Sequence, residues 1–157
     1  GDPFIFGRGG EEIESLMSHK INFQVVPGIS AANGVAAYAG IPLTHRDYAQ
    51  SCLFLTGHFK EGKIDFDWPK LITDKQTVVI YMGLLSLPDF IKQLVFHGQK
   101  KTMPIAVIER GTTDSQRVVQ GNIGNIINKI SRSKIKSPAL IIIGEVVKLR
   151  RQLNWFN

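Results

Sequence analysis

Cysteine, long apolar runs and spaced metal ligands are all missing or scarce in this 157-residue chain. The single cysteine, Cys52, excludes an internal disulfide framework and is typical of a reducing compartment. No apolar run is long enough to span a bilayer, so no membrane partner is expected. The four histidines have no spacing that suits metal ligation, so we expect no metal site. With 43% hydrophobic and 20% charged residues, the composition predicts a soluble globular protein.

Acidic residues are outnumbered by basic ones, and the formal net charge is +6. This balance favours an anionic partner. The basic residues form only short clusters, at positions 100–101, 132–136 and 148–151, and no basic stripe alternates with stacking aromatics. Nucleic-acid grooves use such stripes, so the pattern favours a small polyanion over a nucleic acid.

What the chain does have is a glycine-rich turn at its start. Four glycines and a proline surround Asp2 within residues 1–10, and Glu11 and Glu12 follow. Glycine lets a backbone approach a ligand closely, at a cost in conformational entropy on folding. Such a turn normally follows a strand, yet the chain opens with it, on Gly1. We therefore expect a piece of a longer protein that is divided within a binding site.

Helical and strand patterns alternate along the rest of the chain, which predicts an α/β fold. The expected helices are 11–20, 31–39, 88–97 and one through 123–130. The expected strands are 22–26, 52–56, 77–82, 104–109, 117–119 and 139–143, and residues 59–74 read as a loop with a short helix. Because the apolar run at 52–56 is almost continuous, we expect that strand to be covered on both faces. The short connection near Arg117 leaves a purely parallel order open.

A break at Pro42 to Thr44 suggests two units. Residues 1–43 would be the end of a truncated first α/β domain, and residues 44–157 a complete second α/β domain. Alone, the first unit would expose an unpaired sheet edge and bury little apolar surface.

Four turns carry unusual residues where ligands of α/β sheets usually bind, beyond the carboxyl ends of strands. They are 1–10, 27–31, 82–83 and 109–113. Free N–H groups at the following helix starts favour a nucleotide-like cofactor, although a purely structural glycine turn is the alternative. Ser30 is expected to cap the helix that follows it.

Three groups of residues together resemble the uroporphyrinogen-III C-methyltransferases, the tetrapyrrole-methylase half of bifunctional sirohaem synthases. They are GDPFIFGRGGEE at 1–12, VPGISAANGVAAYAGIPLTHR at 26–46, and YMG at 81–83 with ERGTT at 109–113. The resemblance implies a tetrapyrrole-methylase fold, with two α/β domains and an active site between them. It also implies S-adenosylmethionine as methyl donor, uroporphyrinogen III as acceptor, precorrin-2 as product, and a cytoplasmic homodimer.

The resemblance assigns site residues only where the motifs match. Cofactor contacts fall on Gly1, Asp2, Ile5, Ser30, Ala31, Met82 and Gly111. Arg8 and Met82 match positions that face the substrate, and an Arg suits its propionate groups because its planar fork binds carboxylates. The family's first glycine-rich motif and its acid–base residues match nothing here, so no catalytic residue is assigned and we expect those groups upstream of Gly1.

The leading hypothesis is thus an S-adenosylmethionine-dependent C-methyltransferase whose isolated piece is inactive or nearly so. One alternative is a non-catalytic remnant or dimerisation module. Another is a methylase of the same fold that acts on a different acceptor, such as RNA or a later corrin intermediate.

Overall fold

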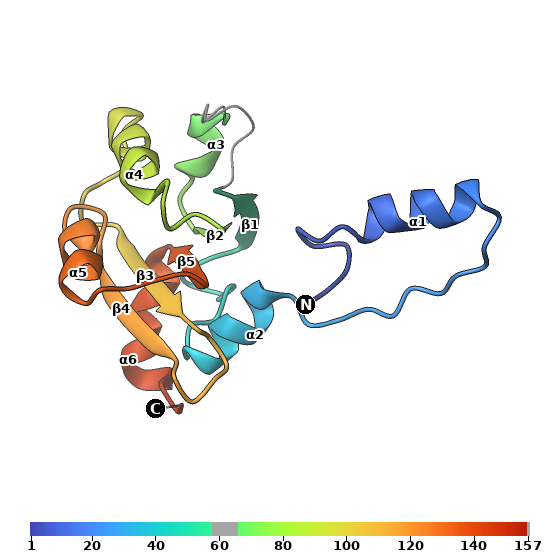
Figure 1. Ribbon diagram of the computed structural model, residues 1–157. Coiled ribbons are helices and arrows are strands. Elements are labelled where there is room, and N and C mark those ends of the chain that lie inside the picture. The colour runs from blue at the N-terminus through green and yellow to red at the C-terminus, as the bar shows by residue number, and fades with distance from the viewer. Residues whose placement is uncertain (58–65, 157) are drawn as a thin grey trace.

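A five-stranded mixed sheet forms the centre of the protein (Figure 1). The structure is a computed structural model, and it describes residues 1–57 and 66–156. The strands are β1 (Ser51–Thr56), β2 (Gln76–Tyr81), β3 (Pro104–Glu109), β4 (Arg117–Asn122) and β5 (Ala139–Ile143). Their order across the sheet is β1-β2-β5-β3-β4. Only β1 and β2 pair in parallel, while the other three pairings are antiparallel. As a result β1, β2 and β3 run in the same direction.

Short helices precede, connect and follow these strands. They are α1 (Gly9–Ser18), α2 (Ala31–Tyr38), α3 (Trp68–Leu71), α4 (Leu87–Phe96), α5 (Ile126–Arg132), the 3-10 helix η2 (Glu145–Leu149) and α6 (Arg150–Leu153). Gly40, at φ +64°, follows the end of α2, and Gly98, at φ +106°, follows α4. Both glycines help to end their helices, because glycine adopts the left-handed conformation without the steric cost that a Cβ would bring.

The sheet is buried between two helical layers, as its β-branched strands predict. Val78 and Ile80 belong to a cluster that includes residues of α3, α4 and α5. Val79 and Tyr81, their neighbours along β2, belong to a second cluster with residues of α2 and η2. In Figure 1, α3 and α4 lie on one side of the sheet, and α2 and α6 on the other. Side chains alternate across a strand, so each strand contributes to both layers.

Strand β1 lies at an edge of the sheet, a position that the sequence does not predict. It pairs with β2 in the described sheet, and Cys52 to Thr56 are only partly buried. Both faces of β1 are nevertheless covered as expected, since Leu53 and Leu55 pack against one buried cluster and Cys52 and Phe54 against the other. An apolar run reports the affinity of a segment for a core, but its place in the sheet depends on which other strands pair with it.

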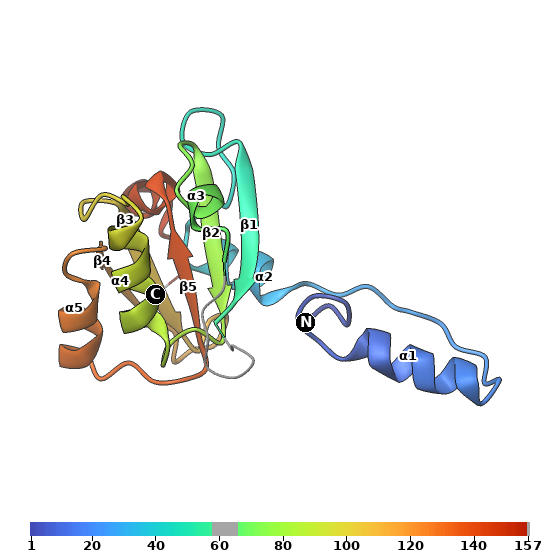
Figure 2. The ribbon, with the colours of Figure 1, turned by 90° about the horizontal axis from the view of Figure 1, so that it is seen from above.

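Most of residues 1–30 extend away from the sheet as an arm made of the first turn, α1 and a long extended segment (Figures 1 and 2). Phe6 and Ser30 keep it in contact with Tyr81 at the end of β2. The strand predicted at 22–26 is not formed. A strand requires a neighbour for its backbone hydrogen bonds, and no described segment pairs with this one. The apolar side chains of the arm are correspondingly exposed, with Met17 at 62%.

Ala32 and Ala36 of α2, and Ala39 just after it, belong to the same buried cluster as Val79. The division into one unit at 1–43 and another at 44–157 stays a prediction. Of the loop expected at 59–74, residues 59–65 lie outside the described part, and α3 is the short helix expected within it. None of the described helices is long and apolar enough to cross a membrane.

Candidate functional site

Strands β2 and β3 run in the same direction, so the turns after them lie at the same edge of the sheet, the one formed by the carboxyl ends of these strands. Three residues of these turns that are not glycine have left-handed backbones: Met82 at φ +53°, Arg110 at φ +46° and Thr112 at φ +69°. This conformation costs about 1–2 kcal/mol for a residue with a Cβ. Strain of this kind concentrates at functional sites, so the cluster marks this edge as a candidate site.

A cavity of about 770 Å³ opens at this edge. Five of the seven cofactor residues expected from the sequence line it: Gly1, Ser30, Ala31, Met82 and Gly111. They come from four separate segments of the chain. The volume lies within the range of small-molecule sites, and most of the lining is apolar with a few polar groups, as such sites require.

The other two expected residues, Asp2 and Ile5, line a neighbouring cavity of about 600 Å³. The two cavities share Ile29, Ser30, Gly34 and Tyr38, so they lie on either side of the start of α2.

Arg8, the expected substrate residue, lines neither of these cavities. It forms an exposed ion pair with Glu11, with 2.6 Å between its Nε and the Glu11 Oε2. Met82, expected to contact both ligands, lines the larger cavity and is 58% exposed. The structure therefore brings Met82 to the site but leaves Arg8 on the arm.

Asp2 joins the first turn to the turn at 27–28. Its Oδ2 accepts a hydrogen bond from the Gly28 N–H at 3.0 Å, and its Oδ1 accepts one from the Phe4 N–H at 2.8 Å. These bonds, the one from Gly28 foremost, lower the pKa of the Asp2 carboxyl. Gly28 has no room for a Cβ, which would lie 2.3 Å from the Gly1 carbonyl oxygen. The two glycine turns thus hold each other in place.

Tyr81 fixes the start of α2 on the end of β2. Ser30 occupies the expected N-cap position, but its side chain does not cap the helix. Its hydroxyl instead contacts the Tyr81 hydroxyl, whose oxygen accepts a hydrogen bond from the Ala32 N–H at 2.8 Å. The prediction that Ser30 caps its own helix was wrong because a buried tyrosine hydroxyl takes that role.

Tyr81 is 9% exposed and lines the larger cavity beside Ser30. Sequence reasoning missed it, although a buried tyrosine whose hydroxyl must find a partner is the signal that could have found it. The two hydroxyls share one hydrogen bond, which leaves one O–H. Because no further acceptor is found for it among the described residues, this O–H is free to donate to a ligand in the cavity.

Gly111 is required by packing rather than by backbone conformation. A Cβ at this position would lie 2.5 Å from Val35 Cγ2 of α2. The glycine thus lets the loop after β3 close onto α2, and both elements line the larger cavity.

The described part of the chain does not support a metal site or a reactive thiol. It holds no group of three or more potential metal ligands. Burial raises the pKa of the Cys52 thiol to about 11, so this thiol remains protonated near neutral pH and suits packing.

Residues 1–127 match the family of Tetrapyrrole (Corrin/Porphyrin) Methylases. The chain belongs to this family. The recognition made from its motifs is thereby confirmed, as is the α/β tetrapyrrole-methylase fold.

Curated relatives of this methylase chain are much longer than the chain itself. It is 60% identical over 156 residues to the siroheme synthase of Methylobacillus flagellatus, which covers 99% of this chain and 33% of that protein. It is 59% identical over 155 residues to the siroheme synthase of Acinetobacter baylyi, covering 99% of this chain and 34% of the relative. The chain thus spans about a third of the length of these relatives.

Solved structures match the same fold. Uroporphyrin-III C-methyltransferase from Thermus thermophilus superposes with a TM-score of 0.81 at 32% identity, over 98% of this chain and 64% of that one. The same enzyme in complex with S-adenyl homocysteine gives a TM-score of 0.78 over 95% of this chain and 64% of that one, again at 32% identity.

Proposed function

We propose that this chain is part of a uroporphyrinogen-III C-methyltransferase, which transfers methyl groups from S-adenosylmethionine and converts uroporphyrinogen III to precorrin-2. The observation that carries the proposal is the convergence of Gly1, Ser30, Ala31, Met82 and Gly111 on one cavity. The motifs that nominated these residues are far apart in the sequence, so nothing in their spacing requires them to meet.

The cavity residues fit the cofactor. S-adenosylmethionine combines a nucleoside with an amino acid, so it needs both apolar surface and polar partners. Ile29, Val35 and Leu140 supply apolar lining, and the free hydroxyl hydrogen of the Ser30–Tyr81 pair supplies a donor. Gly1, Ser30, Ala31, Met82 and Gly111 would contact the cofactor from the larger cavity, and Asp2 and Ile5 from the smaller one.

When bound, the cofactor supplies an electrophilic methyl group on a sulfonium sulfur. Because such a donor is already reactive, the contribution of this chain is to hold both ligands in line for transfer. Arg8 and Met82 would contact the acceptor, and the net charge of +6 would attract its carboxylates. Removal of the pyrrole proton requires a base. We place the acid–base groups in the part of the longer relatives that this chain does not cover.

We further propose that the whole enzyme is a cytoplasmic homodimer and that the 157-residue chain alone transfers methyl groups poorly or not at all. The apolar arm is consistent with this incompleteness, since Phe4, Phe23 and Val26 are exposed. Such side chains usually gain stability by packing against another surface.

A chimera tests the function. This chain would replace the matching third of the Methylobacillus flagellatus siroheme synthase, and transfer of labelled methyl groups to uroporphyrinogen III would be measured anaerobically. We expect turnover within about tenfold of the unmodified relative, and none from the 157-residue chain alone.

Failure of a folded chimera that binds S-adenosylhomocysteine to methylate uroporphyrinogen III would contradict the proposed acceptor. It would favour a methylase of the same fold with another acceptor. Failure to bind S-adenosylhomocysteine would instead favour a non-catalytic module.

A further inference from the structure

A third cavity, of about 500 Å³, adjoins the larger one, and more basic than acidic residues line it. Four cationic residues, Arg110, Arg117, Lys134 and Lys136, line it together with two acidic ones, Glu109 and Asp114. Arg110 and Ser115 line both this cavity and the larger one. The two cavities are therefore neighbours that meet at Arg110.

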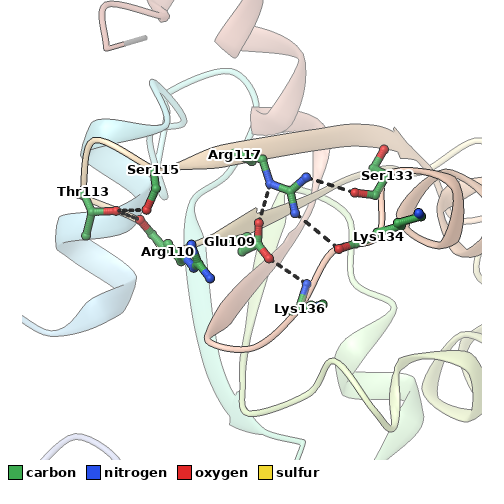
Figure 3. A network of polar contacts seen from close by, with 8 residues as sticks. All are labelled: Glu109, Arg110, Thr113, Ser115, Arg117, Ser133, Lys134 and Lys136. Atoms are coloured by element: carbon green, nitrogen blue, oxygen red, sulfur yellow. Dashed lines mark hydrogen bonds and ion pairs between the residues drawn. The ribbon is translucent and has the colours of Figure 1, made fainter.

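The Glu109 carboxylate is engaged by other groups and forms no hydrogen bond or ion pair with Arg110, which acts on it only through its charge (Figure 3). Its Oε2 pairs with Arg117 Nε at 2.5 Å, and its Oε1 accepts a hydrogen bond from the Lys136 N–H at 2.8 Å. Arg117 also donates to the carbonyl oxygens of Ser133 and Lys134, at 3.0 and 3.3 Å. This network is complete without Arg110.

The Arg110 backbone is held firmly while its guanidinium is not. Its N–H donates to the Pro138 carbonyl at 3.0 Å, and its own carbonyl accepts from Thr113 Oγ1 at 2.8 Å. Within residues 1–57 and 66–156, the guanidinium has no hydrogen bond or ion pair, and no dashed line in Figure 3 ends on it. It is a free cation at the junction of two cavities.

The backbone conformation of Arg110 favours a ligand-binding role for its side chain. At φ +46° a glycine would be unstrained, whereas arginine is not. Among the described residues, its guanidinium forms no hydrogen bond or ion pair that would offset the strain. A residue that keeps its side chain at a strained position with no structural partner is a candidate for ligand binding.

We propose that Arg110 forms a carboxylate-binding subsite at the rim of the larger cavity. The inference rests on the proposed function, whose two ligands both carry carboxylates. Arginine binds this group with two parallel hydrogen bonds. The carboxylate can come from the uroporphyrinogen side chains or from the amino-acid part of the cofactor, and both sources require the same chemistry.

The test compares Arg110→Gly, Arg110→Ala and Arg110→Lys in the chimera, with Lys75→Gly as a matched control. Lys75 is also exposed and left-handed, at φ +55°, but it precedes β2 at the opposite edge of the sheet. Dissociation constants would be measured for uroporphyrinogen III, S-adenosylhomocysteine and 5′-methylthioadenosine, which lacks the carboxylate. Urea unfolding of the same variants in the 157-residue chain would report stability.

We expect Arg110→Gly and Arg110→Ala each to weaken binding of one carboxylate ligand by about tenfold, with a smaller loss for Arg110→Lys. Lys75→Gly should leave binding unchanged. The urea midpoint should rise for both glycine variants but not for Arg110→Ala, because only glycine relieves the backbone strain. Weaker binding in a more stable protein is the result that a purely structural role of Arg110 could not produce.

Loss confined to uroporphyrinogen III would identify the acceptor as the source of the carboxylate. Loss for S-adenosylhomocysteine but not for 5′-methylthioadenosine would identify the cofactor. Unchanged binding of both carboxylate ligands, or equal loss for S-adenosylhomocysteine and 5′-methylthioadenosine, would overturn the subsite. If the unmodified chimera binds neither carboxylate ligand, the proposed function itself fails and the subsite falls with it.

Discussion

At the scale of single residues, the Tyr81 hydroxyl joins the start of α2 to the end of β2. Tyr81→Phe keeps the ring but leaves the buried Ala32 N–H without its acceptor and Ser30 without its partner. A lost buried acceptor costs about 1–3 kcal/mol, so we expect the free energy of unfolding to fall by that amount. Urea denaturation of the 157-residue chain measures it.

Tyr48→Phe is the matched control for this substitution. Tyr48 is partly buried, and its hydroxyl has no hydrogen-bond partner in the described part of the chain. The control should change stability by less than about 0.5 kcal/mol. Equal effects of the two substitutions would show that the Tyr81 hydroxyl does not anchor the helix.

The motifs predicted which residues line the same cavity, but they did not predict the contacts that hold these residues in place. Met82 and Gly111 line the larger cavity as the motifs suggested, and Gly111 is explained by its approach to Val35. The role of Tyr81 depends on a contact 51 residues away in sequence, with Ser30. A pattern of neighbouring residues contains no information on such a contact.

At the scale of elements, Glu109 connects the end of β3 to β4 and to the loop before β5. The carboxyl is only 3% exposed. Arg117 holds its pKa below the usual value. Because the folded pKa is the lower one, this stabilisation is present above the unfolded pKa and is lost as the pH falls through the folded pKa.

We therefore expect Glu109→Gln to lower the free energy of unfolding by about 1–2 kcal/mol at pH 7. This loss of free energy is moderate because water can solvate the half-exposed Arg117 once its partner is neutral. The difference from the unmodified protein should shrink below about pH 4.5, where the unfolded carboxyl begins to bind protons. Urea unfolding across a pH series measures both effects.

Asp89→Asn serves as the control, because Asp89 pairs with Lys92 on the exposed surface. It should change stability by about 0.5 kcal/mol or less. A Glu109→Gln difference that stays constant from pH 7 to pH 3 would contradict an ionic role for Glu109.

Elements with complete burial were predicted best. The bounds of β3 and β5 agree with the sequence because their runs of apolar residues are buried on both faces. The edge position of β1 and the absence of a strand at 22–26 could not be predicted, since both depend on which segments lie alongside. Hydrophobicity gives the tendency to pair, while the partner decides whether pairing occurs.

At the scale of the whole molecule, the arm and the sheet should differ sharply in local stability. Backbone amides of β5 are bonded on both sides within the sheet, whereas residues 21–30 have no ladder. Hydrogen exchange of the 157-residue chain should show fast exchange in 21–30 and slow exchange in β5. Similar protection of both segments would contradict the exposed position of the arm.

The central claim is that the larger cavity, between the start of α2 and the turns after β2 and β3, binds the methyl donor. A crystal structure of the chimera with S-adenosylhomocysteine tests it most directly. The account predicts ligand density against Gly1, Ser30, Ala31, Met82 and Gly111. Density for the ligand at another place, with this cavity empty, would contradict it.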